Sequence, residues 1–305
     1  MRAAVIVLFV AGLATASGTG AVVADDIAGP PEVTCVVDVA LVDETRPTPE
    51  IGDYTGSPTR DLATTVYLPA TVDPAPLIVL AHGFDGHPRK FTELALHWAN
   101  AGYAVAVPRF PVSNDEFIAL AGGAFFPERL SDLPQQALDV SFVIDEVLAL
   151  NAATDSEISA RLDPDRIGLY GLSMGSLTVW TTVLGPDATE NRIDALMQSD
   201  GGFPGGPDRL TAVTFPVFMA QSDAERGPFD PAVIVPQYQA IPTEKYMLVM
   251  HGAVHATVAE NTPTPADQAY RIATTVFWDR TLGGEPDEPF PDSIVIDGVT
   301  TFIEG

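Results

Sequence analysis

Short apolar stretches alternate with longer stretches of helical periodicity along most of the chain. The apolar stretches lie at residues 34–42, 63–68, 77–81, 104–107, 167–170, 195–198, 217–220 and 246–250. Most are rich in Val, Ile, Leu and Phe, which is typical of strands that are buried on both faces. The alternation predicts an α/β fold, with one twisted, mostly parallel sheet flanked by helices.

Helical periodicity fills most of the intervals between these strands. Helices are expected at residues 91–101, 134–150, 174–184, 231–240 and 265–282. Clusters of glycine and proline, such as residues 201–207, interrupt the pattern and are expected to be loops. The tail at residues 285–305 is acidic, with a short apolar run at 294–296, and is either an extra edge strand or a loose end. We expect a single domain over residues 25–305.

Residues 1–24 have the layout of a secretory signal peptide. Arg2 precedes an apolar run at residues 3–13, and small residues follow it. The run is too short to span a membrane. Cleavage after Ala16 or after Ala24 fits the pattern equally well. We therefore expect a secreted protein, extracellular or periplasmic, without stable membrane insertion.

The charge balance narrows the range of partners. The formal net charge is −26, with 41 acidic and 15 basic side chains. A field of this sign repels nucleic acid and anionic membranes, so we expect no nucleic-acid partner and favour neutral substrates. No zinc or calcium spacing stands out among the acidic residues, so we expect no cofactor and no obligatory metal. Cys35 is the single cysteine, which excludes an intramolecular disulfide, and we expect it to be a buried, inert thiol.

The strongest chemical signal is a Gly-x-Ser-x-Gly motif between an expected strand and an expected helix. It reads Gly171-Leu172-Ser173-Met174-Gly175. In a nucleophile elbow the serine occupies a strained turn, and the glycines let strand and helix approach closely. The motif predicts that Ser173 is a nucleophile, and an ordinary Gly-Ser turn is the alternative.

A serine nucleophile needs a base to take its proton, and the chain has five histidines. His255 lies in the loop after the strand at 246–250, where the chain order serine, acid, histidine places the base. His251, which directly follows that strand, is the alternative. The histidines that are expected to be structural or solvated are His82, His87 and His97.

The acid that orients the imidazole is expected at a strand end between the serine and the histidine. Asp223 follows the strand at 217–220 and is favoured. Asp200 follows the preceding strand and is the alternative acid. Glu225 and Asp230 are near enough that a shift of the loop would allow either to substitute, although most charges in such loops are solvated.

An oxyanion intermediate needs two hydrogen-bond donors. A glycine-rich turn at residues 82–86 follows the strand at 77–81. The backbone N–H groups of Phe84 and Met174 are expected to be the donors, with His82 anchoring the loop.

These motifs resemble the lipase, cutinase and polyester-hydrolase branch of the α/β-hydrolases, together with the related platelet-activating-factor acetylhydrolases. The resemblance is carried by residues 82–86, 171–175, 218–223 and 252–255. It implies the α/β-hydrolase fold and a serine carboxylic-ester hydrolase that forms an acyl-enzyme. The lipase and cutinase pattern places the acid at Asp223, whereas the acetylhydrolase pattern places it at Asp200.

The resemblance implies neutral esters with short to medium acyl chains as substrates, whether small molecules, lipids or polyesters. Residues 198–201 lack the tryptophan of polyester hydrolases, which argues against aromatic polyesters. The segment 115–132, with Phe117, Phe125 and Phe126, is interpreted as a partial cover of an acyl pocket. The alternatives are a phospholipase A2-type acetylhydrolase of short-acyl phospholipids, an acyltransferase, and an inactive binding module on a hydrolase fold.

Overall fold

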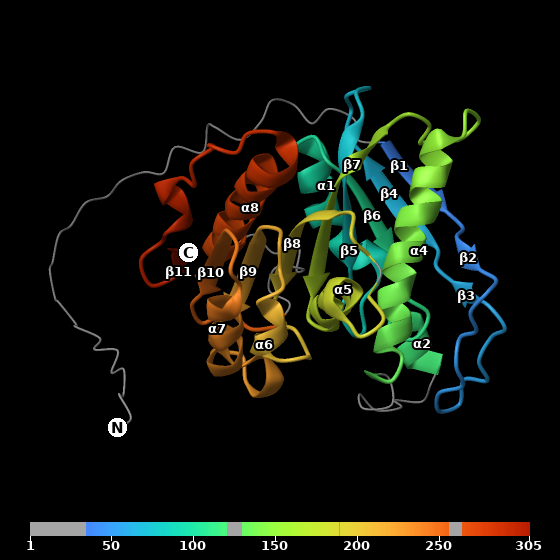
Figure 1. Ribbon diagram of the computed structural model, residues 1–305, viewed down its shortest axis with the longest axis horizontal. Coiled ribbons are helices and arrows are strands. Elements are labelled where there is room, and N and C mark those ends of the chain that lie inside the picture. Colours follow the sequence, from blue (N-terminus) through green and yellow to red (C-terminus); the bar gives the residue numbers. More distant parts are fainter. Residues whose placement is uncertain (1–34, 121–129, 189, 256–263) are drawn as a thin grey trace, which may run out of the picture. The chain divides into compact units, whose positions relative to one another are not determined.

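The computed structural model describes residues 35–120, 130–188, 190–255 and 264–305 (Figure 1). The expected signal peptide at 1–24 lies outside these residues, and so do Phe125 and Phe126 of the expected cover. Within the described part of the chain, no helix is long and apolar enough to cross a membrane.

A nine-stranded sheet is the centre of the fold, with strands in the order β1-β4-β6-β5-β7-β8-β9-β10-β11. The central strands β6, β5, β7, β8, β9 and β10 run parallel, while β1, β4 and β11 add antiparallel pairs at the two edges. The bounds are β1 Cys35–Val39, β4 Thr64–Leu68, β5 Ala75–Ala81, β6 Ala104–Pro108, β7 Leu162–Leu172, β8 Ile193–Ser199, β9 Val217–Ser222, β10 Lys245–Met250 and β11 Thr300–Glu304. This confirms the predicted, mostly parallel α/β fold.

Helices cover both faces of the sheet (Figure 1). Their bounds are α1 Thr92–Asn100, α2 Asp115–Leu120, α4 Leu133–Ala152, α5 Met174–Leu184, α6 Pro207–Leu210, α7 Pro231–Ala240 and α8 Pro265–Trp278. Helices α5 and α7 have the predicted bounds. Helix α8 ends earlier than predicted, and one π-helical turn, Asp279–Gly283, continues it.

The two cores follow from the alternation of side chains along the strands. In β5, Leu77 and Val79 pack with helices α4, α5 and α7, whereas Ile78 and Leu80 pack with α1 and α8. Successive strand residues point to opposite faces, so a strand that is apolar throughout must be covered on both sides. The continuous apolar runs in the sequence therefore required two helical layers.

The chain ends form edge strands. Strand β11 pairs antiparallel with β10, from Tyr246 opposite Glu304 to Met250 opposite Thr300. The apolar run at 294–296 is not this strand, because a 3-10 turn occupies Asp292–Ile294. Cys35 is exposed at the start of β1, so the expectation of a buried thiol is wrong. Strand β1 pairs on one side only, and Val37 is its one buried residue.

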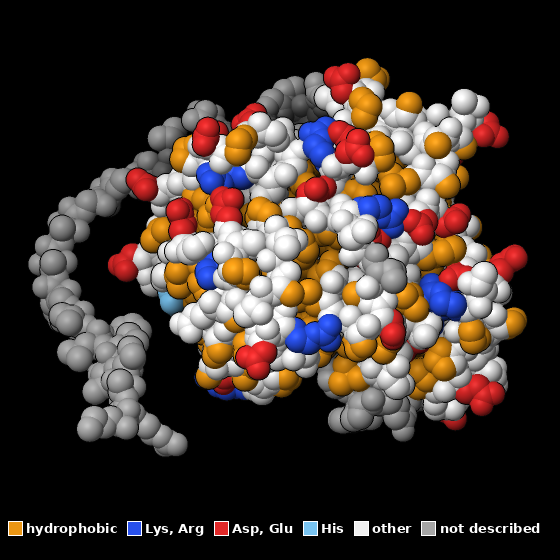
Figure 2. Space-filling model, viewed as in Figure 1, with side chains coloured by type: hydrophobic (Ala, Val, Ile, Leu, Met, Phe, Trp, Pro, Cys, Tyr) orange, Lys and Arg blue, Asp and Glu red, His pale blue; other side chains and the backbone are white. Residues whose placement is uncertain are grey.

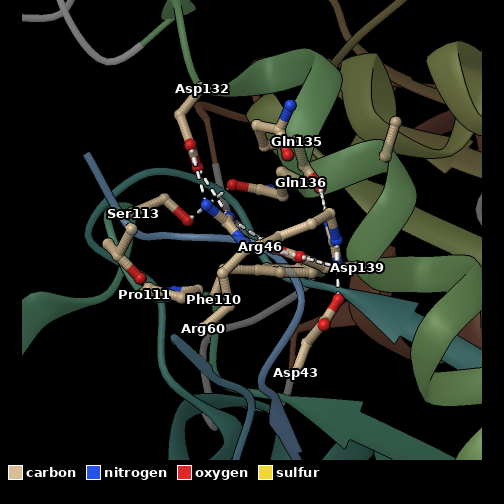
Figure 3. A network of polar contacts seen from close by, with 12 residues as sticks. Asp43, Arg46, Arg60, Phe110, Pro111, Ser113, Asp132, Gln135, Gln136 and Asp139 are labelled. Atoms are coloured by element: carbon tan, nitrogen blue, oxygen red, sulfur yellow. Dashed lines mark hydrogen bonds and ion pairs between the residues drawn. The ribbon is translucent and has the colours of Figure 1, made fainter. Parts of the chain in front are cut away.

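A buried charged network ties the chain before β4 to helix α4 (Figure 3). Strands β2 Val42–Asp43 and β3 Arg60–Asp61 form a separate pair beside it. Arg60 is fully buried and donates to Asp132 at 3.0 and 2.9 Å and to Asp139 at 2.7 and 2.5 Å. Arg46 lies 2.8 Å from Asp139 and 2.6 Å from Asp43. Paired charges with satisfied hydrogen bonds are the form in which a protein interior tolerates ions.

Candidate active site

Four parallel strands bring polar residues to one edge of the sheet. Ser173, Asp200, Asp223 and His251 directly follow the last residues of β7, β8, β9 and β10. The strand ends are in register, since Leu172 lies opposite Ser199 and Met250 lies opposite Ser222. The carboxyl ends of such strands are where α/β proteins assemble their sites.

Ser173 occupies a strained turn between β7 and α5. Its φ is 58° and its ψ is −121°, a conformation that costs a non-glycine residue about 1–3 kcal/mol. Two backbone hydrogen bonds maintain the turn, from the Ser173 N–H to the Ser199 carbonyl and from the Ser176 N–H to the Ser173 carbonyl, each 2.9 Å. Strain of this kind is retained where the surroundings over-determine the conformation, and it clusters at active sites.

The glycines of the motif are required by backbone packing around this turn. A Cβ atom on Gly171 would lie 2.3 Å from the carbonyl oxygen of Gly175. A Cβ atom on Gly175 would lie 1.9 Å from the carbonyl oxygen of Ala81 in β5. Because the obstructing atoms are backbone, no side-chain movement relieves either overlap.

His255 contacts Ser173 directly. Its Nε2 atom lies 2.6 Å from the Ser173 Oγ atom. The loop after β10 carries His255 there, and Gly252 at the start of this loop has a φ of 68°. Phe229 stacks on the imidazole, with ring centroids 5.4 Å apart and planes 21° from parallel. The structure thus brings together the serine and the histidine that the sequence pointed to, at the separation a general base needs.

Two carboxylates lie near the same imidazole. Glu225 Oε1 is 3.3 Å from His255 Nδ1. Asp200 is fully buried, and its two oxygens accept hydrogen bonds from the Ser222 N–H at 2.6 Å and the Ser222 hydroxyl at 2.9 Å. One carboxylate oxygen of Asp200, one of Glu225 and one ring nitrogen of His255 all lie within 4.8 Å of one another. Among the described residues, this cluster has the spacing that could hold a metal ion, and it includes the imidazole whose Nε2 atom contacts Ser173.

The environment of Asp200 makes it easier to protonate. Burial is the main cause that raises the pKa of Asp200 to about 6, and the negative charge of Glu225 acts in the same direction. The hydrogen bonds from Ser222 and the proximity of His255 partly oppose the rise. A positive charge on His255 would therefore favour the ionised form of this carboxyl group.

Asp223, the acid favoured by the sequence, contacts a different histidine. Its Oδ2 atom lies 2.8 Å from Nδ1 of His251, and its Oδ1 atom accepts a hydrogen bond of 2.7 Å from the Gly252 N–H. The backbone N–H of Asp223 also donates to the Met250 carbonyl, which fixes Asp223 beside the end of β10 and the start of the loop. The structure therefore pairs Asp223 with His251 and not with His255, contrary to the favoured interpretation.

His82 anchors the turn that follows β5. Its Nε2 atom accepts a hydrogen bond of 3.1 Å from the Phe110 N–H, so the proton resides on Nδ1, which donates to the Gly83 carbonyl at 2.7 Å. Burial lowers the pKa of His82 to about 4, which keeps the ring neutral. In a trans peptide the carbonyl and the following N–H point in opposite directions. Fixing the Gly83 carbonyl therefore also fixes the direction of the Phe84 N–H.

The same turn packs against Ser173. A Cβ atom on Gly83 would lie 2.9 Å from the Ser173 Cβ atom, so only glycine permits this approach. On the other side of Ser173, Met174 is the first residue of α5. The first N–H groups of a helix lack intrahelical partners and carry partial positive charge. Phe84 thus lies in the turn that packs against Ser173, and Met174 lies at the start of the helix that follows Ser173.

The other aromatic and histidine candidates lie in the protein interior or contact other elements. Phe110 and Phe203 are buried in the core on the α4 and α5 side of the sheet. His97 in α1 contacts the Arg271 carbonyl and the Thr275 hydroxyl of α8. Burial lowers the pKa of His97 to about 4, as suits a structural role.

The fold is shared with a known esterase structure. A ferulic acid esterase from Streptomyces cinnamoneus matches with a TM-score of 0.67 and 19% sequence identity, over 91% of this chain and 98% of that chain. No protein-family model matches the sequence. No curated protein matches it either.

Proposed function

We propose that the protein is a secreted serine carboxylic-ester hydrolase that acts through an acyl-enzyme. The contact of 2.6 Å between His255 Nε2 and Ser173 Oγ is the observation that carries this proposal. His255 takes the hydroxyl proton while Oγ attacks the ester carbonyl carbon, and it then donates that proton to the leaving alcohol. Water, activated by the same imidazole, attacks the acyl-enzyme and releases the acid and free Ser173. Secretion is supported by the N-terminal sequence alone.

The negative charge that develops on the carbonyl oxygen is assigned to two backbone donors. Phe84 follows Gly83, whose backbone packs against Ser173 and whose carbonyl contacts His82, and Met174 begins α5 directly after Ser173. Preorganised donors of this kind stabilise the transition state more than the ground state.

We assign the orienting acid to Asp200 instead of Asp223, because Asp200 lies in the carboxylate cluster at His255. Asp200→Asn is expected to lower kcat by about 10⁴-fold, the loss seen when a triad acid is neutralised. Asp223→Asn is expected to have a much smaller effect, since Asp223 contacts His251. Measurement of kcat and KM for both variants distinguishes the two, and a larger loss in Asp223→Asn would overturn the assignment.

Neutral esters with short to medium acyl chains are the proposed substrates, and no cofactor or metal takes part. Figure 2 shows Asp and Glu side chains scattered over the visible face, consistent with the net charge of −26. Such a surface disfavours anionic substrates.

The function is tested by the hydrolysis of p-nitrophenyl esters from acetate to palmitate. We expect turnover with an optimum at short or medium chains, and the same rate after dialysis against EDTA. Inactivity toward every ester of the series would contradict the proposal. Loss of activity in EDTA would point to a metal in the Asp200 cluster.

A phospholipase of the acetylhydrolase type is the second candidate. It is favoured by the position of the acid, since Asp200 follows β8, one strand before Asp223. Hydrolysis of a short-acyl phospholipid at a higher kcat/KM than the best p-nitrophenyl ester would select this candidate.

A further inference from the structure

The loop between β9 and α7 lies against His255 at two points. Phe229 stacks on the face of the imidazole. Glu225, four residues earlier, approaches the Nδ1 edge of the ring, and its side chain is only 11% exposed. A short segment thus contacts both the face and the edge of the proposed base.

The Nδ1 atom of His255 needs an acceptor for its proton. It is buried, and it has no aligned hydrogen bond to any described residue. Glu225 Oε1 is the carboxylate oxygen that comes within ion-pair distance, at 3.3 Å, among the described residues. Asp200 also lies within 4.8 Å, and its two oxygens accept hydrogen bonds from Ser222. Glu225 is therefore a second carboxylate beside Asp200, at the Nδ1 edge of the ring.

We propose that Glu225 is a positioning residue for His255 and shares with Asp200 the stabilisation of its cationic form. The inference rests on the proposed hydrolase function. When Ser173 attacks the ester, its proton passes to Nε2 and the imidazole becomes a cation with a proton on each nitrogen. The Nδ1 proton stays on the ring, and Glu225 Oε1 lies 3.3 Å from Nδ1. When the alcohol leaves, the Nε2 proton goes to it and the ring is neutral again.

The charges around the ring support two carboxylates acting together. Asp200 reaches the ring from the end of β8 and Glu225 from the loop after β9. Arg226, the next residue of this loop, donates to the carbonyls of Asp223 and Glu225. Asp223 is paired with His251. Burial and the negative charge of Glu225 raise the pKa of Asp200 to about 6, so the two carboxylates lie close enough to affect each other as well as the ring.

Glu225→Gln keeps the size of the side chain and removes its charge, which makes the cation on His255 less favourable. We expect kcat/KM on the pH plateau to fall about tenfold, and the acidic limb of its pH profile to move to lower pH by about one unit, as loss of an opposite charge within a few Å implies. The low-field proton NMR signal of His255 Nδ1–H is expected to move upfield. If Glu225 had only a structural role, Glu225→Gln would lower activity without moving the acidic limb of the pH profile or the NMR signal.

Two further variants complete the test. Asp230→Asn removes one charge from the same loop, and asparagine also caps α7 as Asp230 does, so the acidic limb is expected to stay in place. Glu225→Asp keeps the charge and is expected to move the limb less than Glu225→Gln.

The outcomes separate the two proposals. If the wild-type protein hydrolyses esters, and Glu225→Gln has the same acidic limb of the pH profile and the same His255 NMR signal as wild type, the role proposed for Glu225 is overturned. If no ester is hydrolysed but the NMR signal moves in Glu225→Gln, the contact is supported and the hydrolase function fails.

Discussion

Replacement of Ser173 by alanine is expected to lower kcat for ester hydrolysis by about a million-fold, the loss typical when a nucleophile that acts with its base is removed. The reason is local, because Oγ is the atom that contacts His255 Nε2 and the atom that would form the acyl bond. The turn itself should persist, since its hydrogen bonds involve the backbone of residue 173. The measurement is kcat on the best p-nitrophenyl ester, with circular dichroism to verify folding.

Ser159→Ala provides the matched control, because it makes the same serine-to-alanine change in the turn before β7, at the other end of that strand. We expect wild-type kcat for this variant. Residual activity of a few per cent or more in Ser173→Ala would show that another group is the nucleophile.

Replacement of Asp139 by alanine is expected to lower the free energy of unfolding by about 3–5 kcal/mol, the loss typical of breaking a buried ion pair. Asp139 accepts hydrogen bonds from Arg60 and forms an ion pair with Arg46, and its side chain is fully buried. Without it the buried Arg60 guanidinium loses two of its four hydrogen bonds to carboxylates and keeps only those to Asp132, and Arg46 keeps Asp43 as its partner. Urea unfolding followed by tryptophan fluorescence measures the change.

The control is Asp163→Ala, which breaks a surface pair. Asp163 lies 2.7 Å from Arg166, and the two side chains are 26% and 37% exposed. Solvent screens such a pair, so we expect a loss below about 1 kcal/mol. Equal losses in the two variants would show that burial of the network adds nothing to stability.

The central strands were predictable because each one is a short, continuous apolar run in the sequence, and only one kind of element buries such a run. A run such as Leu77 to Ala81 is apolar on both faces, and only a strand covered by two layers buries it. The edge strands were harder, because one of their faces is exposed and their side chains are mixed. The tail illustrates this, since its most apolar residues, at 294–296, precede β11, whose pairing depends on backbone hydrogen bonds to β10.

The sequence alone determined the α/β class, the strand–serine–helix turn and the late histidine loop. These depend on short-range rules, namely side-chain alternation and glycine spacing, which a linear pattern records. Only the tertiary structure decided which carboxylate lies near His255. Asp200, Asp223 and Glu225 all fit the chain order, and a shift of two residues along one loop exchanges a contact with His251 for a contact with His255. That choice depends on the register of β8, β9 and β10 and on the path of two loops, which are fixed by contacts between residues far apart in the chain.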